Sequence, residues 1–113
     1  MEERRKHKRY RKKLDARYSC AKGPLIIESK TKSKDISATG IRLPLDDALK
    51  VSDRVRLAIT LPWKRHVLDA IARVVWASPR LITSDLTIKR DCGLEFIWTS
   101  MSDVQAAIKP SRS

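Results

Sequence analysis

The sequence "KDISATGIRL", residues 34–43, lies between two segments in which apolar and polar residues alternate. Alternation with a period of two is typical of a β-strand that buries one face. Asp35, Ser37 and Gly40 interrupt the alternation, and residues of these three types favour a turn. The stretch therefore predicts a corner between two strands, unless the three residues also form part of a ligand site.

The same alternation recurs on both sides of this corner. The clearest case is residues 54–61, RVRLAITL, and longer patterns cover residues 67–77 and 86–98. No helical pattern falls between the strands, which argues against βαβ units. About six short antiparallel strands of this kind close well into a small barrel or a sandwich. The sequence therefore predicts an all-β protein.

The end of the chain has a different pattern. Ser102 followed by Gln105 matches a capping box, and the residues after them favour a helix that Pro110 would stop. We expect a short C-terminal helix at about residues 102–109. A helix of this length must pack against the sheet to be stable.

Positive charge is concentrated at the start of the chain. The 113 residues include 25 Lys and Arg against 13 Asp and Glu, a net charge of +12, and residues 1–13 hold eight of the cations and two of the acids. Because this segment has no apolar periodicity, we expect a flexible basic arm at residues 1–13 and one domain at residues 14–113. The charge indicates an anionic partner, which could be a nucleic acid, a nucleotide or a membrane surface.

Several classes of protein are disfavoured. No segment approaches the length of an apolar membrane span, and the basic start is not followed by the apolar run of a signal peptide, so we expect a cytoplasmic protein. Cys20 and Cys92 lie on the apolar phase of their strands, and we expect both to be reduced and buried. No metal-binding, phosphate-loop or catalytic motif is present, which favours a binding protein over an enzyme.

Two stretches have side chains suited to a nucleotide. Arg5 and Arg9 lie four residues apart, and the arginine fork matches both phosphate oxygens and the edge of guanine. The carboxylate of Asp35 can accept from guanine N–H groups, and the hydroxyl of Ser37 can donate to a phosphate. Gly40 would allow close backbone approach or a positive φ. Taken singly, the first stretch is better explained as a solvated tail and the second as a turn.

Together, the order and spacing of Arg5-xxx-Arg9 and Asp35-x-Ser37-x-x-Gly40 resemble the signature of PilZ domains, bacterial receptors for cyclic di-GMP. The later segments "IRLPL", "LAITLP", "ARVVWA" and "GLEF" also resemble strands of that family, so the likeness covers nearly the whole chain. It implies a small six-stranded antiparallel β-barrel, the PilZ-like split barrel, with a C-terminal helix.

The resemblance also implies a ligand and a site. The ligand would be cyclic di-GMP, with no further cofactor, and the residues that match the family's motifs are Arg5, Arg9, Asp35, Ser37 and Gly40. The arm would order over the bound ligand and alter the interaction with a downstream protein partner that the sequence does not name. Arg4 and Arg42 are weaker candidates for ligand contact.

Two other functions remain open. One is binding of single-stranded nucleic acid, which small basic β-barrels achieve with stacking aromatic residues. The other is a PilZ-like interaction module that binds no ligand. Most aromatic residues, including Trp76 and Trp98, fall in the core phase of their strands, and Trp63 is the only one expected to be exposed. This pattern disfavours a nucleic-acid surface.

Overall fold

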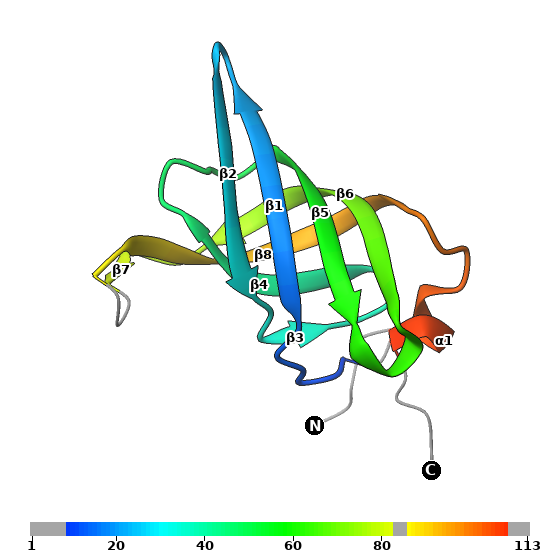
Figure 1. Ribbon diagram of the computed structural model, residues 1–113. Helices are drawn as coiled ribbons and strands as arrows, with labels where there is room; N and C mark the ends of the chain where they lie inside the picture. Colours follow the sequence, from blue (N-terminus) through cyan, green and yellow to red (C-terminus); the bar gives the residue numbers. More distant parts are fainter. Residues whose placement is uncertain (1–8, 83–85, 109–113) are drawn as a thin grey trace.

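The computed structural model describes residues 9–82 and 86–108. Within them the chain forms eight strands, one 3₁₀ turn η1 (Pro62–Lys64) and one helix α1 (Val104–Ile108), as Figure 1 shows. The strands are β1 (Asp15–Lys22), β2 (Leu25–Lys32), β3 (Asp35–Ile36), β4 (Gly40–Asp46), β5 (Arg54–Leu61), β6 (His66–Ala77), β7 (Leu81–Ile82) and β8 (Ile88–Thr99).

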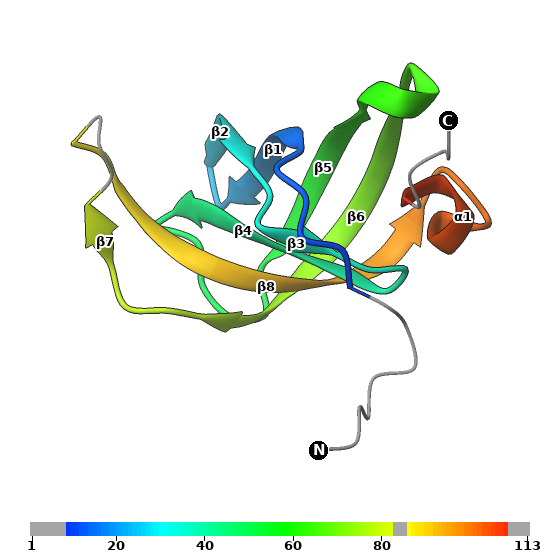
Figure 2. The same cartoon turned by 90° about the horizontal axis from the view of Figure 1, so that it is seen from below.

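All strands belong to one antiparallel sheet in the order β2-β1-β5-β6-β8-β4-β3, with β7 paired to β8 outside this path. The sheet curls on itself (Figure 2). Its ladder is not closed: β2 approaches β4 through a side-chain contact, in which Thr31 Oγ1 donates to the Pro44 carbonyl at 2.7 Å. The predicted all-β fold with a short C-terminal helix is confirmed. The difference is two extra strands of two residues each, β3 and β7, beside the six long ones.

The core lies inside the curled sheet and follows the predicted alternation. In β5, Val55, Leu57, Ile59 and Leu61 are each at most 1% exposed. Tyr18 is also buried, and its hydroxyl accepts from the Asp46 N–H at 2.9 Å. Both cysteines are buried free thiols, as expected, and burial raises the pKa of the Cys92 thiol to about 11.

The prediction that Trp76 and Trp98 are core residues is wrong. Ile71 and Ala72 pair with Trp98 and Phe96, which leaves Ile97 as an extra residue in β8, and Val75 is likewise extra in β6. Each extra residue is a β-bulge that reverses the facing of the side chains beyond it. Trp76 and Trp98 are therefore 43% and 52% exposed.

Trp63, the residue expected to be exposed, packs instead against the core. Its side chain is partly buried in η1, and its Nε1 donates to the Ala107 carbonyl of α1 at 3.0 Å. The Lys12 ammonium lies 5.5 Å from the centroid of its ring. The indole thus ties the C-terminal helix to the sheet and is not available as a stacking surface.

The helix α1 is shorter than predicted and has a different cap. It begins at Val104, and the Asp103 carboxylate, rather than the Ser102 hydroxyl, accepts from the Ala106 N–H at 3.0 Å. Gln105 does not complete a capping box, because its amide donates to the Tyr10 hydroxyl at 3.2 Å. Residue 109, the predicted last residue, lies outside the described residues. In the described part of the chain, no helix is long and apolar enough to cross a membrane.

Candidate functional site

The predicted corner at residues 34–43 is a tight β3–β4 hairpin. Asp35 pairs with Arg42, Ile36 pairs with Ile41, and the Ser37 N–H donates to the Gly40 carbonyl at 2.8 Å. The Ser37 hydroxyl is buried and accepts from the Thr39 N–H at 3.3 Å. In this state Ser37 therefore stabilises the turn.

Gly40 is needed for close approach between two backbones. A Cβ at this position would lie 2.4 Å from the Leu94 carbonyl oxygen of β8, closer than real Cβ contacts. Its φ is not in the left-handed region, which among the described glycines only Gly23 occupies. Of the two reasons that the sequence offered for a glycine here, close approach is the correct one.

The described end of the basic arm runs along the free edge of β3. Tyr10 and Ile36 exchange two backbone hydrogen bonds of 2.8 and 2.9 Å. The Ser33 hydroxyl accepts from the Leu14 N–H at 3.0 Å and donates to the Lys12 carbonyl. Within the described part of the arm, backbone contacts with the domain are thus already present at Tyr10, four residues before the expected boundary at Leu14.

Arg9 reaches the hairpin through this pairing and contacts Asp35. Arg9 Nη1 lies 2.6 Å from Asp35 Oδ1, and Arg42 Nε lies 3.0 Å from Oδ2 of the same carboxylate. The Asp35 side chain is 13% exposed, whereas those of Arg9 and Arg42 are 36% and 40% exposed. One carboxylate between two guanidinium groups leaves a net positive cluster that suits an anionic ligand.

Arg42 is less well hydrogen-bonded than Arg9. Its buried Nε faces Asp35 Oδ2 at ion-pair distance, but the geometry does not make a hydrogen bond, and Nε has no other partner among the described residues. A buried donor without a hydrogen bond carries a free-energy cost that an added acceptor would relieve. Arg42, a weaker candidate from sequence, therefore belongs to the same cluster as Arg9 and Asp35.

Trp76 extends this cluster across the sheet. Cross-strand pairing places Asp35, Arg42, Gly93 and Trp76 in one row over β3, β4, β8 and β6. The indole lies on Gly93, because a Cβ there would sit 2.0 Å from Trp76 Nε1. An exposed indole next to a guanidinium offers an aromatic face for a base.

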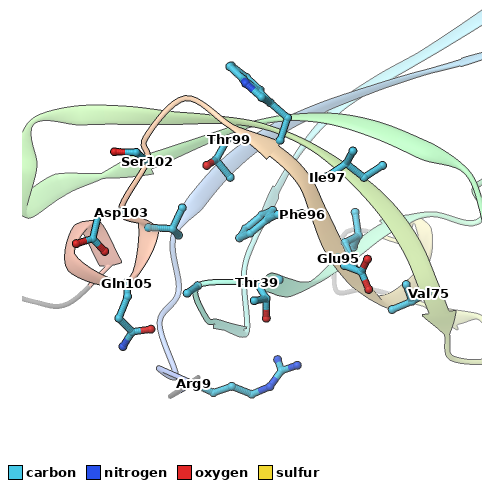
Figure 3. Close-up of a pocket in the computed structure, with 15 residues that line it drawn as sticks. Arg9, Thr39, Val75, Glu95, Phe96, Ile97, Thr99, Ser102, Asp103 and Gln105 are labelled. Atoms are coloured by element: carbon cyan, nitrogen blue, oxygen red, sulfur yellow. The ribbon is translucent and has the colours of Figure 1, made fainter. Parts of the chain in front are cut away.

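A pocket of about 720 Å³ opens beside the hairpin, between β8, the β3–β4 turn and α1. Figure 3 shows Arg9 and Thr39 on one side of it, Phe96 near its middle, and Asp103 and Gln105 on the α1 side. Gly40 also lines the pocket, whereas Asp35, Ser37 and Arg42 do not. The charged cluster and the pocket therefore meet at Arg9 and Gly40.

The site residues predicted from sequence fall into three groups. Arg9, Asp35 and Arg42 form the charged cluster, and Ser37 and Gly40 shape the hairpin that carries Asp35. Arg4 and Arg5 lie outside the described residues. The described residues hold no group of three or more His, Cys, Asp or Glu side chains that could bind a metal ion.

Sequence reasoning missed three residues that build this site. Tyr10 was identifiable as the one aromatic residue in the arm, whereas Ser33 sits in a polar run that gives no signal. Trp76 was misplaced, although "VVW" at 74–76 puts three apolar residues in succession and so breaks the alternation. A run of apolar residues that interrupts the alternation is the feature of the sequence that could have predicted this bulge.

Comparison with known families and structures agrees with this geometry. The model of the PilZ domain matches residues 3–109, so the chain belongs to the PilZ domain family. A comparison with curated protein sequences found no match.

Two solved structures are similar. The first is the Bacillus subtilis inhibitor of motility MotI/DgrA, with 28% identity, a TM-score of 0.68 and 94% of this chain covered. This chain spans about half of that protein, 48% of its length. The second is the PilZ domain of Escherichia coli YcgR with c-di-GMP, with 15% identity and a TM-score of 0.55, covering 84% of this chain and 79% of that one.

Proposed function

We propose that this protein is a cytoplasmic, non-enzymatic receptor for cyclic di-GMP. The observation that carries the proposal is the contact between Arg9 and Asp35, because it joins the arginine motif of the arm to the hairpin motif 26 residues later. Membership of the PilZ domain family supports it. So does the presence of c-di-GMP with the similarly folded PilZ domain of Escherichia coli YcgR.

In this proposal, the guanidinium groups bind the anionic part of the ligand. Arg9 and Arg42 are each more than a third exposed, so both can turn donors toward phosphate oxygens while they stay near Asp35. Arg5, the other arginine of the motif, adds a further donor from the arm. Trp76 supplies a surface for a guanine ring at the far end of the row.

Asp35 has a specific task in this site. A carboxylate next to phosphates is electrostatically unfavourable. We therefore infer that Asp35 has a role that a neutral residue could not fill. Both of its oxygens face arginines here, so it orients Arg9 and Arg42 when no ligand is bound. Once either arginine turns to a phosphate, one oxygen becomes free to accept from the Watson–Crick edge of guanine.

Ligand binding becomes a signal through the arm. Residues 10–14 already contact the hairpin and Ser33. We propose that the ligand also binds the part of the arm that carries Arg4 and Arg5. Neutralising these cations with ligand phosphates changes the charge of one face of the domain. We propose that a downstream protein partner senses this face.

Calorimetry with cyclic di-GMP, cyclic di-AMP and GTP tests the proposal. We expect micromolar or tighter binding of cyclic di-GMP, and a loss of tenfold or more in Arg9→Ala because a charge-assisted contact is removed. The matched control is Arg11→Ala, an exposed arginine two residues along the same arm. Equal binding by wild type and Arg9→Ala would contradict the site, and no heat with any nucleotide would favour an interaction module without ligand.

A further inference from the structure

The outer face of the sheet over β5, β6 and β8 carries exposed basic side chains and the exposed indole of Trp98, which the proposed nucleotide site does not use. Cross-strand pairing places Arg56, Ile71 and Trp98 in one row over these strands. A second row holds Arg54, Arg73 and Glu95. We call these two rows the outer basic face.

Positive charge on this face is only partly compensated. Arg73 lies 4.0 Å from Glu95, a long ion pair between two exposed side chains, and contributes little local neutralisation. No described carboxylate lies within ion-pair distance of Arg54 or Arg56. Arg54 and Arg56 are therefore uncompensated cations, and they contribute nothing to the stability of the protein through ion pairs.

Two tryptophans adjoin these cations. Trp98 is 52% exposed and neighbours Ile71, and the bulge residue Ile97 beside it is 50% exposed. Trp76 lies on the adjacent strand two side-chain rows away, on the order of 13 Å from Trp98 for a rise of about 3.3 Å per residue. Because Trp76 is already assigned to the proposed nucleotide site, the exposed apolar surface left without a role is the adjacent pair Ile97 and Trp98.

Aromatic rings on an open sheet face, flanked by arginines, match the chemistry of single-stranded nucleic acid. Bases stack on aromatic side chains in a sequence-tolerant way, while phosphates follow the cations. A second copy of this chain is a poorer occupant, because two molecules of charge +12 repel each other. An acidic protein would also satisfy the arginines, but only its aromatic residues could stack on the indole, whereas every base of a single strand has a π-face.

We propose that the outer basic face binds single-stranded nucleic acid, with a base stacked on Trp98 and phosphates held by Arg54 and Arg56. The inference rests on the bulge at Ile97, which turns Trp98 outward, and not on the cyclic di-GMP site. It reverses the expectation from sequence that the aromatic residues are unavailable for stacking.

The first test is fluorescence anisotropy with a labelled 15-nucleotide oligothymidine at two salt concentrations. We expect micromolar binding at low salt in the wild-type protein. Trp98→Ala should weaken it about 5- to 100-fold, the usual effect of losing one base stack. Absence of binding, or equal affinity in Trp98→Ala, would overturn the proposal.

The second test separates a defined site from general charge attraction. In Arg54→Ala/Arg56→Ala, the slope of log affinity against log salt should fall by about 1.4, since each phosphate contact with a single strand contributes about 0.7. The matched control is Lys64→Ala/Arg65→Gly, which removes two exposed cations from the β5–β6 connection, at the other end of β5. Glycine is compatible with the positive φ of 51° at position 65.

An equal loss in the control pair would mean unspecific attraction to a basic protein and would overturn the site. A polyglutamate peptide of 15 residues is the comparison for an acidic protein partner. If it binds as tightly as the oligonucleotide and with the same dependence on Trp98, the face is a protein-docking surface and the nucleic-acid proposal fails. Calorimetry with cyclic di-GMP on Arg54→Ala/Arg56→Ala should be unchanged, so failure here leaves the proposed receptor function intact.

Discussion

Asp35 and Gly40 show how far single residues could be assigned from sequence. Their types and spacing predicted a corner, which the structure confirms, and a ligand site, which stays a prediction. Asp35 lies between two guanidinium groups, and Gly40 lets β4 approach the backbone of β8. The pairing of Asp35 with Arg42 was not predicted from the sequence, because it depends on the register of the β3–β4 hairpin.

Replacing Asp35 tests its role in reading guanine. We expect Asp35→Ala to lower the affinity for cyclic di-GMP at least tenfold and to lower that for cyclic di-AMP less, because guanine offers two adjacent N–H donors to a carboxylate at its Watson–Crick edge, whereas adenine offers one donor beside an acceptor. Calorimetry with both nucleotides measures the ratio, with the exposed Asp15→Ala as control. An unchanged preference, or tighter binding of both nucleotides, would show that Asp35 only shapes the turn.

Gly40→Ala tests the close approach of β4 to β8. Because the added Cβ would meet a backbone oxygen at 2.4 Å, we expect a loss of about 1–3 kcal/mol in the free energy of unfolding. Urea denaturation measures it. Gly23→Asn is the control, since nothing lies within 4 Å of a Cβ there and asparagine tolerates its φ of +62°. Equal stability of Gly40→Ala and wild type would contradict the packing described here.

Burial of the Cys92 thiol predicts how the stability of the protein depends on pH. Burial raises its pKa from 9.0 to about 11 in the folded protein, so the thiol contributes stability below pH 9 that is lost as the pH rises from 9 through 11. Urea denaturation under reducing conditions should therefore show that the difference in stability between wild type and Cys92→Ala shrinks between pH 8 and pH 10.5. A difference that stays constant or grows would mean that the thiolate is accommodated in the core.

At the scale of elements, alternation predicted the long strands well but not their bulges. A period of two fixes which side chains face the core only while the pairing stays regular. The runs "VVW" at 74–76 and "FIW" at 96–98 contain no polar residue that would mark the change of face. The pairing of the arm with β3 was also not predictable, because Tyr10 stands among charged residues and no apolar alternation surrounds it.

Ser33 tests how the arm is fixed to the sheet. Its hydroxyl bridges Leu14 and Lys12, so Ser33→Ala should cost about 1–3 kcal/mol and leave a buried backbone N–H without its partner. We also expect weaker binding of cyclic di-GMP, because Arg9 would be held less firmly near Asp35. Ser29→Ala, at an exposed position of β2, is the control for both measurements. Unaltered stability and affinity in Ser33→Ala would show that the Ser33 hydroxyl does not fix the arm.

At the scale of the whole molecule, the proposed site and the outer basic face occupy different parts of one curled sheet. The site lies where the arm, β3 and β4 meet, whereas the outer basic face lies over β5, β6 and β8. The pocket beside Arg9 lies between them, and Trp98 lines that pocket. A ligand bound at Arg9 can therefore alter the surroundings of Trp98 without a change of fold.

Amide hydrogen exchange with and without cyclic di-GMP tests most directly the claim that the arm and the hairpin form one nucleotide site. Without ligand, the amides of Tyr10 and Leu14 should already be protected, because both donate hydrogen bonds to the hairpin or the residue before it. On addition of ligand, protection should increase together in residues 4–9 and 34–42, with little change in β5. Protection that increases in only one of these two segments, or that appears in β5 instead, would contradict the account.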